Sequence, residues 1–343
     1  MREFEGFYKG INLGGWLSQC RYEKVHYDTF ITEEDIRQIA SWGLDHVRLP
    51  ISYRLLEAGE GAYLEEGFYY IDQCICWCQK YKLKLILDLH STAGYSFSEQ
   101  INDGTDRAAA FLTNEQLIRR FLKLWEAIAT RYRAKTDMLA FEVLNEMVDP
   151  SGGKAWNRLA KRAYETIRAI LPDAKIIIGS NMWNNINTLK YLEKPYDENV
   201  VYTFHFYEPM LFTHQKAPWM DQIPKDIETP YPLAKEEYQK RAEIAGNFAL
   251  MDVKADRVDL EYLEELIKIA LETGEKYNVS LYCGEYGVIN RTDMDSTLNW
   301  YRDLHLIMEK YHISRAAWTY KELDFGITDS QPDSVREELI RCL

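Results

Sequence analysis

The sequence predicts an α/β protein folded as one closed (β/α)8 barrel. Short apolar runs alternate with longer amphipathic segments along almost the whole chain, as strands and helices do in a parallel sheet. Eight such units fit into 343 residues, and eight is the number that closes this kind of barrel. No solenoid repeat, low-complexity segment or linker interrupts the series. We therefore expect residues 1–343 to form a single domain.

The eight expected strands are short runs rich in β-branched and aromatic residues. They cover residues 10–16, 45–50, 83–90, 140–146, 175–179, 200–207, 280–285 and 314–320. The run from 140 to 146 is the most informative, because it is apolar until it ends in Asn145 and Glu146. Burial at the end of a rigid strand raises the pKa of a carboxyl group and suits it to proton donation. Glu146 is therefore a candidate general acid.

Amphipathic segments between these strands are the expected covering helices. They lie at about residues 32–43, 65–81, 114–133, 156–170, 260–277, 293–311 and 333–341. Thr32 followed by three acidic residues has the pattern of a helix start. The alternation pauses between residues 208 and 258, where Pro, Trp and charged residues are frequent and one helix is expected near 234–248. This segment is short for a core of its own, so we expect an inserted cap between the sixth strand and its helix.

Composition excludes some partners. The formal net charge is −13 and no Lys/Arg cluster offsets it, so we expect no nucleic-acid partner. No apolar run is long enough to span a membrane, and residues 1–5 do not resemble an export signal. Cys74, Cys76 and Cys78 are spaced like metal ligands at first sight, but in a helix residues two apart point away from each other. We expect buried, reduced thiols there and no metal.

Polar or aromatic residues collect at the ends of the expected strands. They are Arg48, His90, Asn145, Glu146, His205, Tyr207, Glu285 and Trp318. Each alone has an ordinary structural explanation, such as an ion pair, a core hydrogen bond or packing. In a (β/α)8 barrel, however, the carboxyl ends of all strands meet on one face, where active sites of this fold lie. The convergence therefore predicts one site at the barrel mouth.

Two carboxylates on facing strands can cleave a glycosidic bond. One protonates the leaving oxygen, and the other attacks the anomeric carbon or activates water; the separation of the two groups decides between retention and inversion. We expect Arg48 and Tyr207 to keep Glu285 ionised. Asn145 is placed to bind a sugar hydroxyl, and Trp318 offers a stacking surface for a sugar ring. This chemistry needs no metal and no organic cofactor.

Seven motifs, in order and spanning nearly the whole chain, resemble the family 5 glycoside hydrolases, which are retaining endoglucanases. They are Gly10-Ile-Asn-Leu-Gly-Gly-Trp16, His46-Val-Arg-Leu-Pro50, Asp88-Leu-His90, Leu144-Asn-Glu146, His205-Phe-Tyr207, Gly284-Glu-Tyr-Gly287 and Trp318-Thr-Tyr-Lys321. The stretch from His205 to Trp219 and the insertion after it are similar to those of clostridial-type cellulases.

The resemblance implies a role for each residue. Glu146 would be the acid/base and Glu285 the nucleophile, with no metal ligand. The supporting residues would be Arg48, His90, Asn145, His205, Tyr207 and Trp318. Trp219 is either a further stacking residue or an anchor of the insertion. Two departures from the family pattern, Ser91 after His90 and Met147 after Glu146, leave both carboxylates in place but bear on the choice of sugar.

Several alternatives remain at this level. The expected substrate is a β-1,4-glucan, as cellulose or mixed-linkage β-glucan, bound by a monomer. A β-mannanase or glucomannanase, an exo-acting β-glucanase and a non-catalytic sugar-binding barrel are the alternatives. A metal-dependent barrel hydrolase using His90 and His205 would need further histidine or aspartate ligands. The family resemblance favours an extracellular protein, whereas the N-terminal sequence favours the cytoplasm.

Overall fold

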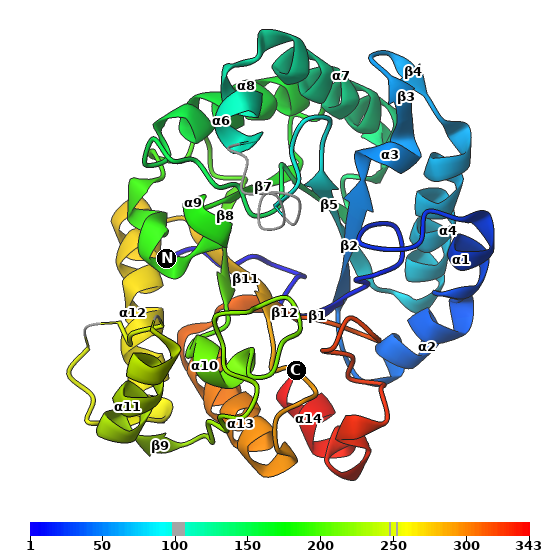
Figure 1. The fold of residues 1–343 in the computed structure, drawn as a ribbon. Helices are drawn as coiled ribbons and strands as arrows, with labels where there is room; N and C mark the ends of the chain where they lie inside the picture. The colour runs from blue at the N-terminus through cyan, green and yellow to red at the C-terminus, as the bar shows by residue number, and fades with distance from the viewer. Residues whose placement is uncertain (98–106, 247, 252) are drawn as a thin grey trace.

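A computed structural model describes residues 1–97, 107–246, 248–251 and 253–343. Eight parallel strands form a closed barrel in the order β1-β12-β11-β8-β7-β6-β5-β2, surrounded by helices (Figure 1). The strands are β1 Lys9–Asn12, β2 His46–Ser52, β5 Lys84–Ser91, β6 Leu139–Glu142, β7 Lys175–Gly179, β8 Val200–Phe206, β11 Ser280–Tyr286 and β12 Ser314–Ala317. The predicted (β/α)8 fold, known as the TIM barrel, is confirmed.

Long helices cover most of the barrel wall. They are α2 Glu33–Ser41, α4 Glu65–Tyr81, α7 Glu115–Arg131, α8 Lys154–Ile170, α12 Leu260–Tyr277, α13 Met294–Tyr311 and α14 Arg336–Cys342. Shorter elements that the sequence did not predict are α1 Lys24–Thr29, α3 Tyr53–Leu56, the hairpin β3 Glu57–Gly59 with β4 Ala62–Tyr63, α6 Arg107–Thr113 and the 3-10 helices η1 Arg133–Lys135 and η3 Gln331–Ser334. The expected start of α2 at Thr32 is present as a capping box with Asp35.

The fifth unit differs from the expected pattern. Between β7 and β8 the chain forms the four-residue α9 Asn181–Asn184 and the 3-10 helix η2 Ile186–Tyr191. Three consecutive residues, Met182, Trp183 and Asn184, have φ of 51°, 58° and 53°. This left-handed conformation cannot continue a right-handed helix, so no long helix covers this part of the described wall.

The barrel interior is built in layers, because inward-pointing side chains recur every second residue along a strand. The lowest layer is mostly apolar and consists of Ile86, Ala140, Ile177, Val201, Tyr282 and Ala316, with Phe4 and Phe7 beneath it. Two residues further along, the same strands place Asp88 and Glu142 in the interior, and β2 adds Arg48; all three are fully buried. The next layer opens at the mouth of the barrel.

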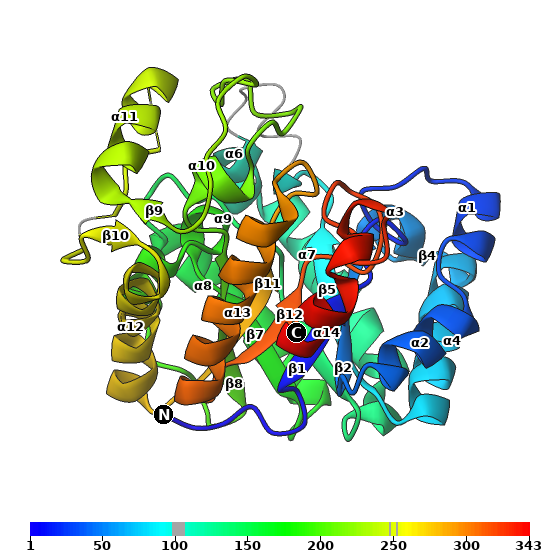
Figure 2. The ribbon, with the colours of Figure 1, turned by 90° about the horizontal axis from the view of Figure 1, so that it is seen from below.

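The segment between β8 and α12 contains α10 Met210–Thr213, the antiparallel pair β9 Leu233–Ala234 and β10 Arg257–Val258, and α11 Lys235–Ala245. In Figure 2 the N-terminus leads into β1 from below, whereas α10 and α11 lie at the upper end, where the strands finish. Tyr231 and Tyr238 are buried within this segment. No helix among the described residues is long and apolar enough to cross a membrane.

Some local predictions need correction. The strands expected over residues 10–16, 140–146 and 314–320 end at Asn12, Glu142 and Ala317. Asn145, Glu146 and Trp318 therefore lie on the loops that follow β6 and β12. Cys74 and Cys78 are buried free thiols as expected, but Cys76 is exposed. Cys76 lies two positions from both Cys74 and Cys78 on α4, and helical residues two positions apart point to different faces of the helix, so Cys76 faces solvent.

Candidate active site

Arg48 lies at the centre of a buried polar network beneath the barrel mouth. Its guanidinium donates two hydrogen bonds to Glu142, at 2.7 and 3.0 Å, and one to Glu285 Oε1, at 2.8 Å. It also donates to Asn12 Oδ1 at 2.9 Å and to Asn145 Oδ1 at 2.8 Å, and Asp88 Oδ2 lies 3.0 Å from Nη2. A planar guanidinium with five fixed donors suits this arrangement. Arg48 therefore holds five side chains, which come from β1, β5, β6 with its following loop, and β11, in one geometry.

Burial sets the charges in this network. It raises the pKa of Asp88 to about 7, although Arg48 opposes the shift, and it also raises the pKa of Glu142. The nearby carboxylates hold the pKa of Arg48 well above its usual range despite the opposing effect of burial. A single permanent cation therefore faces three buried acidic groups, Asp88, Glu142 and Glu285.

Glu146 and Glu285 face each other above Arg48. One oxygen of each, together with a ring nitrogen of His205, lies within 4.8 Å of the others. His205 Nδ1 is 2.7 Å from Glu146 Oε1 and 3.5 Å from Glu285 Oε2. Tyr207 donates its hydroxyl to Glu285 Oε2 at 3.0 Å. Both oxygens of Glu285 thus accept a hydrogen bond, one from Tyr207 and one from Arg48.

The backbone of Glu146 is held in an unusual conformation. Its φ is 46°, a left-handed value that costs free energy for a residue other than glycine. The Tyr95 hydroxyl donates to the Glu146 carbonyl at 2.7 Å and accepts from the Val148 amide at 2.9 Å. Tyr95 is buried, so this bridge fixes the turn and with it the direction of the Glu146 side chain.

The two carboxyl groups differ in environment. Burial raises the pKa of Glu146 well above its ordinary value, and the negative charge of Glu285 adds to the effect. Burial also raises the pKa of Glu285, but the charge of Arg48 and the hydrogen bond from the Tyr207 hydroxyl oppose this. Glu146 therefore holds a proton more firmly than Glu285 does, as is needed where one carboxyl group serves as an acid and the other as an anion.

His90 and Trp318 form the floor of the mouth. Their rings stack at 5.9 Å with an angle of 6°, and His90 Nδ1 is bonded to Asp88 Oδ2 at 2.7 Å. Burial lowers the pKa of His90 to about 3, so the ring is neutral. Among the described residues, no hydrogen-bond partner reaches His90 Nε2 or Asn145 Nδ2. Both nitrogens are therefore buried polar atoms without a hydrogen-bond partner beside the two carboxyl groups.

Trp219 belongs to an aromatic cluster beside the mouth. The residue is 42% exposed, and its ring lies 6.4 Å from the ring of Phe325. Phe325 packs with Trp318 in one apolar cluster and lies 5.9 Å from the ring of Tyr207. The exposed face of Trp219 is therefore connected to the site through one intervening ring.

All eight strand-end residues predicted from the sequence lie in or beside this site, and Trp219 lies at its edge. The sequence alone did not predict the places of Asn12, Asp88, Glu142 and Tyr95 in this site. Two of these had a detectable signal: Asp88 and Glu142 are acidic residues inside otherwise apolar strands, and Asp88 precedes His90 by two positions, which puts both on one side of β5.

The side chains at the mouth are poorly suited to bind a metal ion. Glu146, His205 and Glu285 form one group that could hold an ion, but the Arg48 guanidinium already lies 2.8 Å from Glu285. His90, which the metal alternative requires, is outside that group and has Nδ1 bonded to Asp88. A fixed cation at contact distance disfavours a second cation at the same carboxylate.

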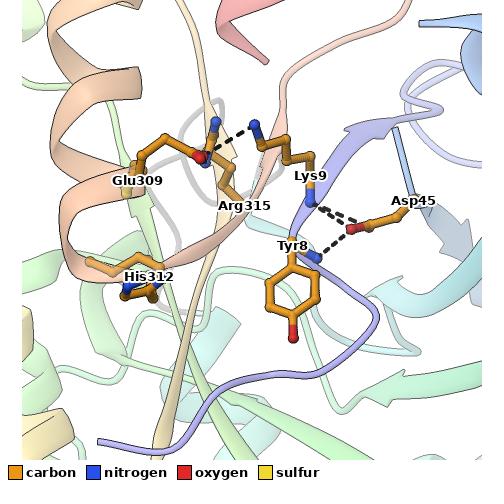
Figure 3. Close-up of a pocket in the computed structure, with 8 residues that line it drawn as sticks. Tyr8, Lys9, Asp45, Glu309, His312 and Arg315 are labelled. Carbon is orange, nitrogen blue, oxygen red and sulfur yellow. Dashed lines mark hydrogen bonds and ion pairs between the residues drawn. The ribbon is translucent and has the colours of Figure 1, made fainter. Parts of the chain in front are cut away.

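A hollow of about 330 Å³, drawn in Figure 3, lies where β1, β2 and β12 begin, at the end of the barrel away from Glu146 and Glu285. It is lined by Tyr8, Lys9, Asp45, Met308, Glu309, His312, Ile313 and Arg315. Its charges pair with one another: Glu309 Oε1 lies 3.3 Å from Lys9 Nζ and 2.9 Å from Arg315 Nη1. This is the end of the barrel that serves stability.

Two facing carboxylates at the mouth of a (β/α)8 barrel, beside hydrogen-bonding groups and aromatic rings, define the class of glycoside hydrolases. The family model "Cellulase (glycosyl hydrolase family 5)" matches residues 9–324. The chain belongs to this family, and it is an endoglucanase-like glycoside hydrolase.

Individual relatives agree with the family. The chain is 41% identical to cellodextrinase A of Ruminococcus flavefaciens over 92% of this chain and 86% of that protein. It is 38% identical to endoglucanase C of Acetivibrio thermocellus over 98% of both chains. The structure of Thermotoga maritima Cel5A in complex with cellobiose matches with a TM-score of 0.76 and 26% identity, over 98% of this chain and 97% of that one. The same Thermotoga protein has been solved with mannotriose.

Proposed function

We propose that the protein is a retaining endo-β-glucanase that cleaves β-1,4-glucosidic bonds in cellulose or mixed-linkage β-glucan. The observation that carries the proposal is the approach of carboxylate oxygens of Glu146 and Glu285 to within 4.8 Å. Retaining enzymes hold their carboxyl groups at about 5–5.5 Å, whereas inverting enzymes leave roughly 6.5–9.5 Å for a water molecule. The narrow gap favours direct attack by a carboxylate.

The reaction divides into two displacements. In the first, a Glu285 oxygen forms a bond to the anomeric carbon while the glycosidic bond breaks, and Glu146 gives its proton to the leaving oxygen. In the second, Glu146 takes a proton from water, the water oxygen attacks the anomeric carbon, and the bond to Glu285 breaks. Arg48 and Tyr207, each bonded to one oxygen of Glu285, stabilise the carboxylate that is released. Asn145 Nδ2 is the donor offered to a sugar hydroxyl beside the reacting carbon.

The sugar preference rests on the relatives and on the aromatic surface. An endoglucanase and a cellodextrinase match this chain over most of its length, which favours β-glucan over mannan. Stacking on Trp318 suits the flat face of glucose rings, and we assign Trp219 to a neighbouring ring. In Figure 2, α10 and α11 lie at the end of the barrel where the strands finish, with α11 to one side above α12; we assign the segment 208–258 the role of a cap that borders the substrate groove.

The direct test is the configuration of the first product. Wild-type protein is incubated with carboxymethyl cellulose, barley mixed-linkage glucan and glucomannan, and the new anomeric signal is followed by NMR. Double displacement predicts that the β-anomer appears first and the α-anomer grows later by mutarotation. Initial release of the α-anomer would contradict retention, faster cleavage of glucomannan would favour the mannan alternative, and no turnover on any polymer would favour a sugar-binding barrel.

The pH profile of kcat/KM should be bell-shaped, with both limbs belonging to the Glu146–Glu285 pair. The acid limb is ionisation of Glu285, because the nucleophile must lose its proton. The alkaline limb is ionisation of Glu146, whose pKa is raised further than that of Glu285, so activity persists well above the ordinary pKa of a glutamate. Initial rates from about pH 3 to about pH 9 check this. An alkaline limb that remains in Glu146→Gln would assign it to another group.

A further inference from the structure

His205 lies between Glu146 and Asn184, a residue that the reaction above does not use. His205 Nδ1 is 2.7 Å from Glu146 Oε1, and its other nitrogen, Nε2, is 3.2 Å from Asn184 Nδ2. Asn184 is fully buried and His205 is 5% exposed. The ring is thus bonded on one side to the carboxyl group that carries the proton and on the other side to a side-chain amide.

The amide nitrogen of Asn184 decides which tautomer His205 adopts. A neutral imidazole has one N–H donor and one acceptor nitrogen, and an amide NH2 group can only donate. When Asn184 Nδ2 donates to Nε2, the ring proton must lie on Nδ1, where it is donated to Glu146 Oε1. The proton of Glu146 must then lie on Oε2, the oxygen that does not face His205. The opposite tautomer would draw that proton onto Oε1, toward His205.

The backbone around Asn184 and the glycine beneath it limit where its side chain can lie; its Oδ1 has no hydrogen-bond partner among the described residues. Its φ of 53° belongs to a run of three left-handed residues, a conformation that asparagine tolerates better than most residues. The next residue, Asn185, forms a parallel β-bridge with His205 itself. Below it, a Cβ on Gly179 would approach Asn184 Oδ1 to 2.4 Å, so a side chain at position 179 would displace the amide.

No charged or titratable group of the described residues that faces His205 is bonded to its Nε2. The titratable or charged groups that face it are Glu146 after β6, Glu285 on β11, Tyr207 after β8, His90 on β5 and Arg48 on β2. Burial and the charge of Arg48 hold the pKa of His205 well below its usual range, so the ring is neutral and has to adopt one tautomer. Among the described residues, Asn184 is the side chain bonded to Nε2.

We propose that Asn184 is a positioning residue that fixes His205 as the Nδ1–H tautomer and thereby places the acid proton of Glu146 on Oε2. The inference about the tautomer stands on the geometry alone. The inference about the acid proton rests on the acid/base role of Glu146 in the proposed function. The two parts are tested separately.

The tautomer is measured directly by 15N NMR of the imidazole nitrogens in uniformly labelled wild-type protein, with His205 assigned by comparison with His205→Asn. The proposal predicts a protonated Nδ1 and an unprotonated Nε2. In Asn184→Asp the carboxylate accepts a hydrogen bond at Nε2, so the Nε2–H form or the doubly protonated ring should appear. A wild-type spectrum with protonated Nε2 overturns the proposal, whether or not any variant folds.

The effect on the acid is measured with two aryl β-cellobiosides. The phenyl leaving group needs protonation, and the 2,4-dinitrophenyl leaving group does not. Asn184→Asp and Gly179→Ala should lower kcat/KM for phenyl cellobioside about tenfold or more, with a much smaller change for the dinitrophenyl substrate. Asn157→Asp is the matched control, because that amide is also buried but binds the Tyr191 carbonyl at 2.8 Å.

A structural role alone would lower both rates in equal proportion, and that result in Asn184→Asp and Gly179→Ala overturns the second part of the proposal. Glu146→Gln separates this failure from failure of the proposed function. If Glu146→Gln slows the phenyl substrate selectively, the acid role holds and the Asn184 result is decisive. If Glu146→Gln shows no selectivity, the acid assignment is wrong, and with it the second part, while the NMR result still decides the first.

Discussion

Replacing Glu285 by glutamine is expected to lower kcat on every cleavable substrate by about four to six orders of magnitude. The amide has the shape of the carboxylate but no charge with which to attack the anomeric carbon. Arg48 Nη1, now 2.8 Å from Glu285 Oε1, can still donate to the amide oxygen, so the fold is expected to survive. Initial rates on carboxymethyl cellulose and on 2,4-dinitrophenyl β-cellobioside measure the loss, and far-ultraviolet circular dichroism checks the fold.

The two substrates distinguish a lost nucleophile from a lost acid. In Glu285→Gln both rates fall together, because no covalent intermediate forms with either leaving group. Glu34→Gln is the control, since that residue is paired with Arg37 on the surface and both rates should stay at the wild-type value. If Glu285→Gln retains more than about a tenth of the wild-type rate on either substrate, Glu285 is not the nucleophile.

The site residues that could be predicted from the sequence are those that lie on the barrel strands or directly after them. Several expected strands end where apolar residues give way to polar ones, and a closed barrel brings these ends together. Arg48, His90, His205 and Glu285 lie on the strands themselves, so locating the strands also located the residues. Glu146 was found in the same way although its strand stops four residues earlier, because the chain continues along the barrel wall.

The parts that were missed depend on tertiary packing. The left-handed turn that carries Asn184 has no glycine, and its conformation follows from contacts with β7 and β8 that no local pattern records. Tyr95 acts through its hydroxyl on the backbone around Glu146, a contact between residues about 50 positions apart. Asp88 and Glu142 were visible as acids in apolar strands, but their common partner Arg48 became evident only when the barrel closed.

The closed barrel makes stability and catalysis depend on the same cation. Arg48 is fully buried between Asp88, Glu142 and Glu285. A buried charge is tolerated when it is paired, and removing one partner leaves the others unpaired at a cost of about 3–5 kcal/mol. Because Arg48 serves three acids at once, its removal leaves three buried carboxyl groups without a counter-charge.

Arg48→Met is therefore expected to lower the free energy of unfolding by about 3–5 kcal/mol at neutral pH. The loss should be smaller in acid. Asp88 has a folded-state pKa raised to about 7 by burial, so its protonated form favours folding at low pH and that contribution disappears as pH rises through about 7. Without Arg48 to oppose the shift, the remaining carboxyl groups bind protons still more readily. Urea unfolding near pH 5 and near pH 8 should show the larger deficit at the higher pH.

Arg37→Met provides the matched comparison, because Arg37 pairs with Glu34 on the surface, where their side chains are 54% and 70% exposed. Exposed pairs contribute about 0–1 kcal/mol and are screened by solvent, so this variant should unfold close to the wild-type midpoint at both pH values. Equal deficits in the two arginine variants, or a deficit of Arg48→Met that does not change with pH, would show that the three acids are not held by charge. In that case packing around the methylene groups of Arg48 would account for its place at the centre of the barrel.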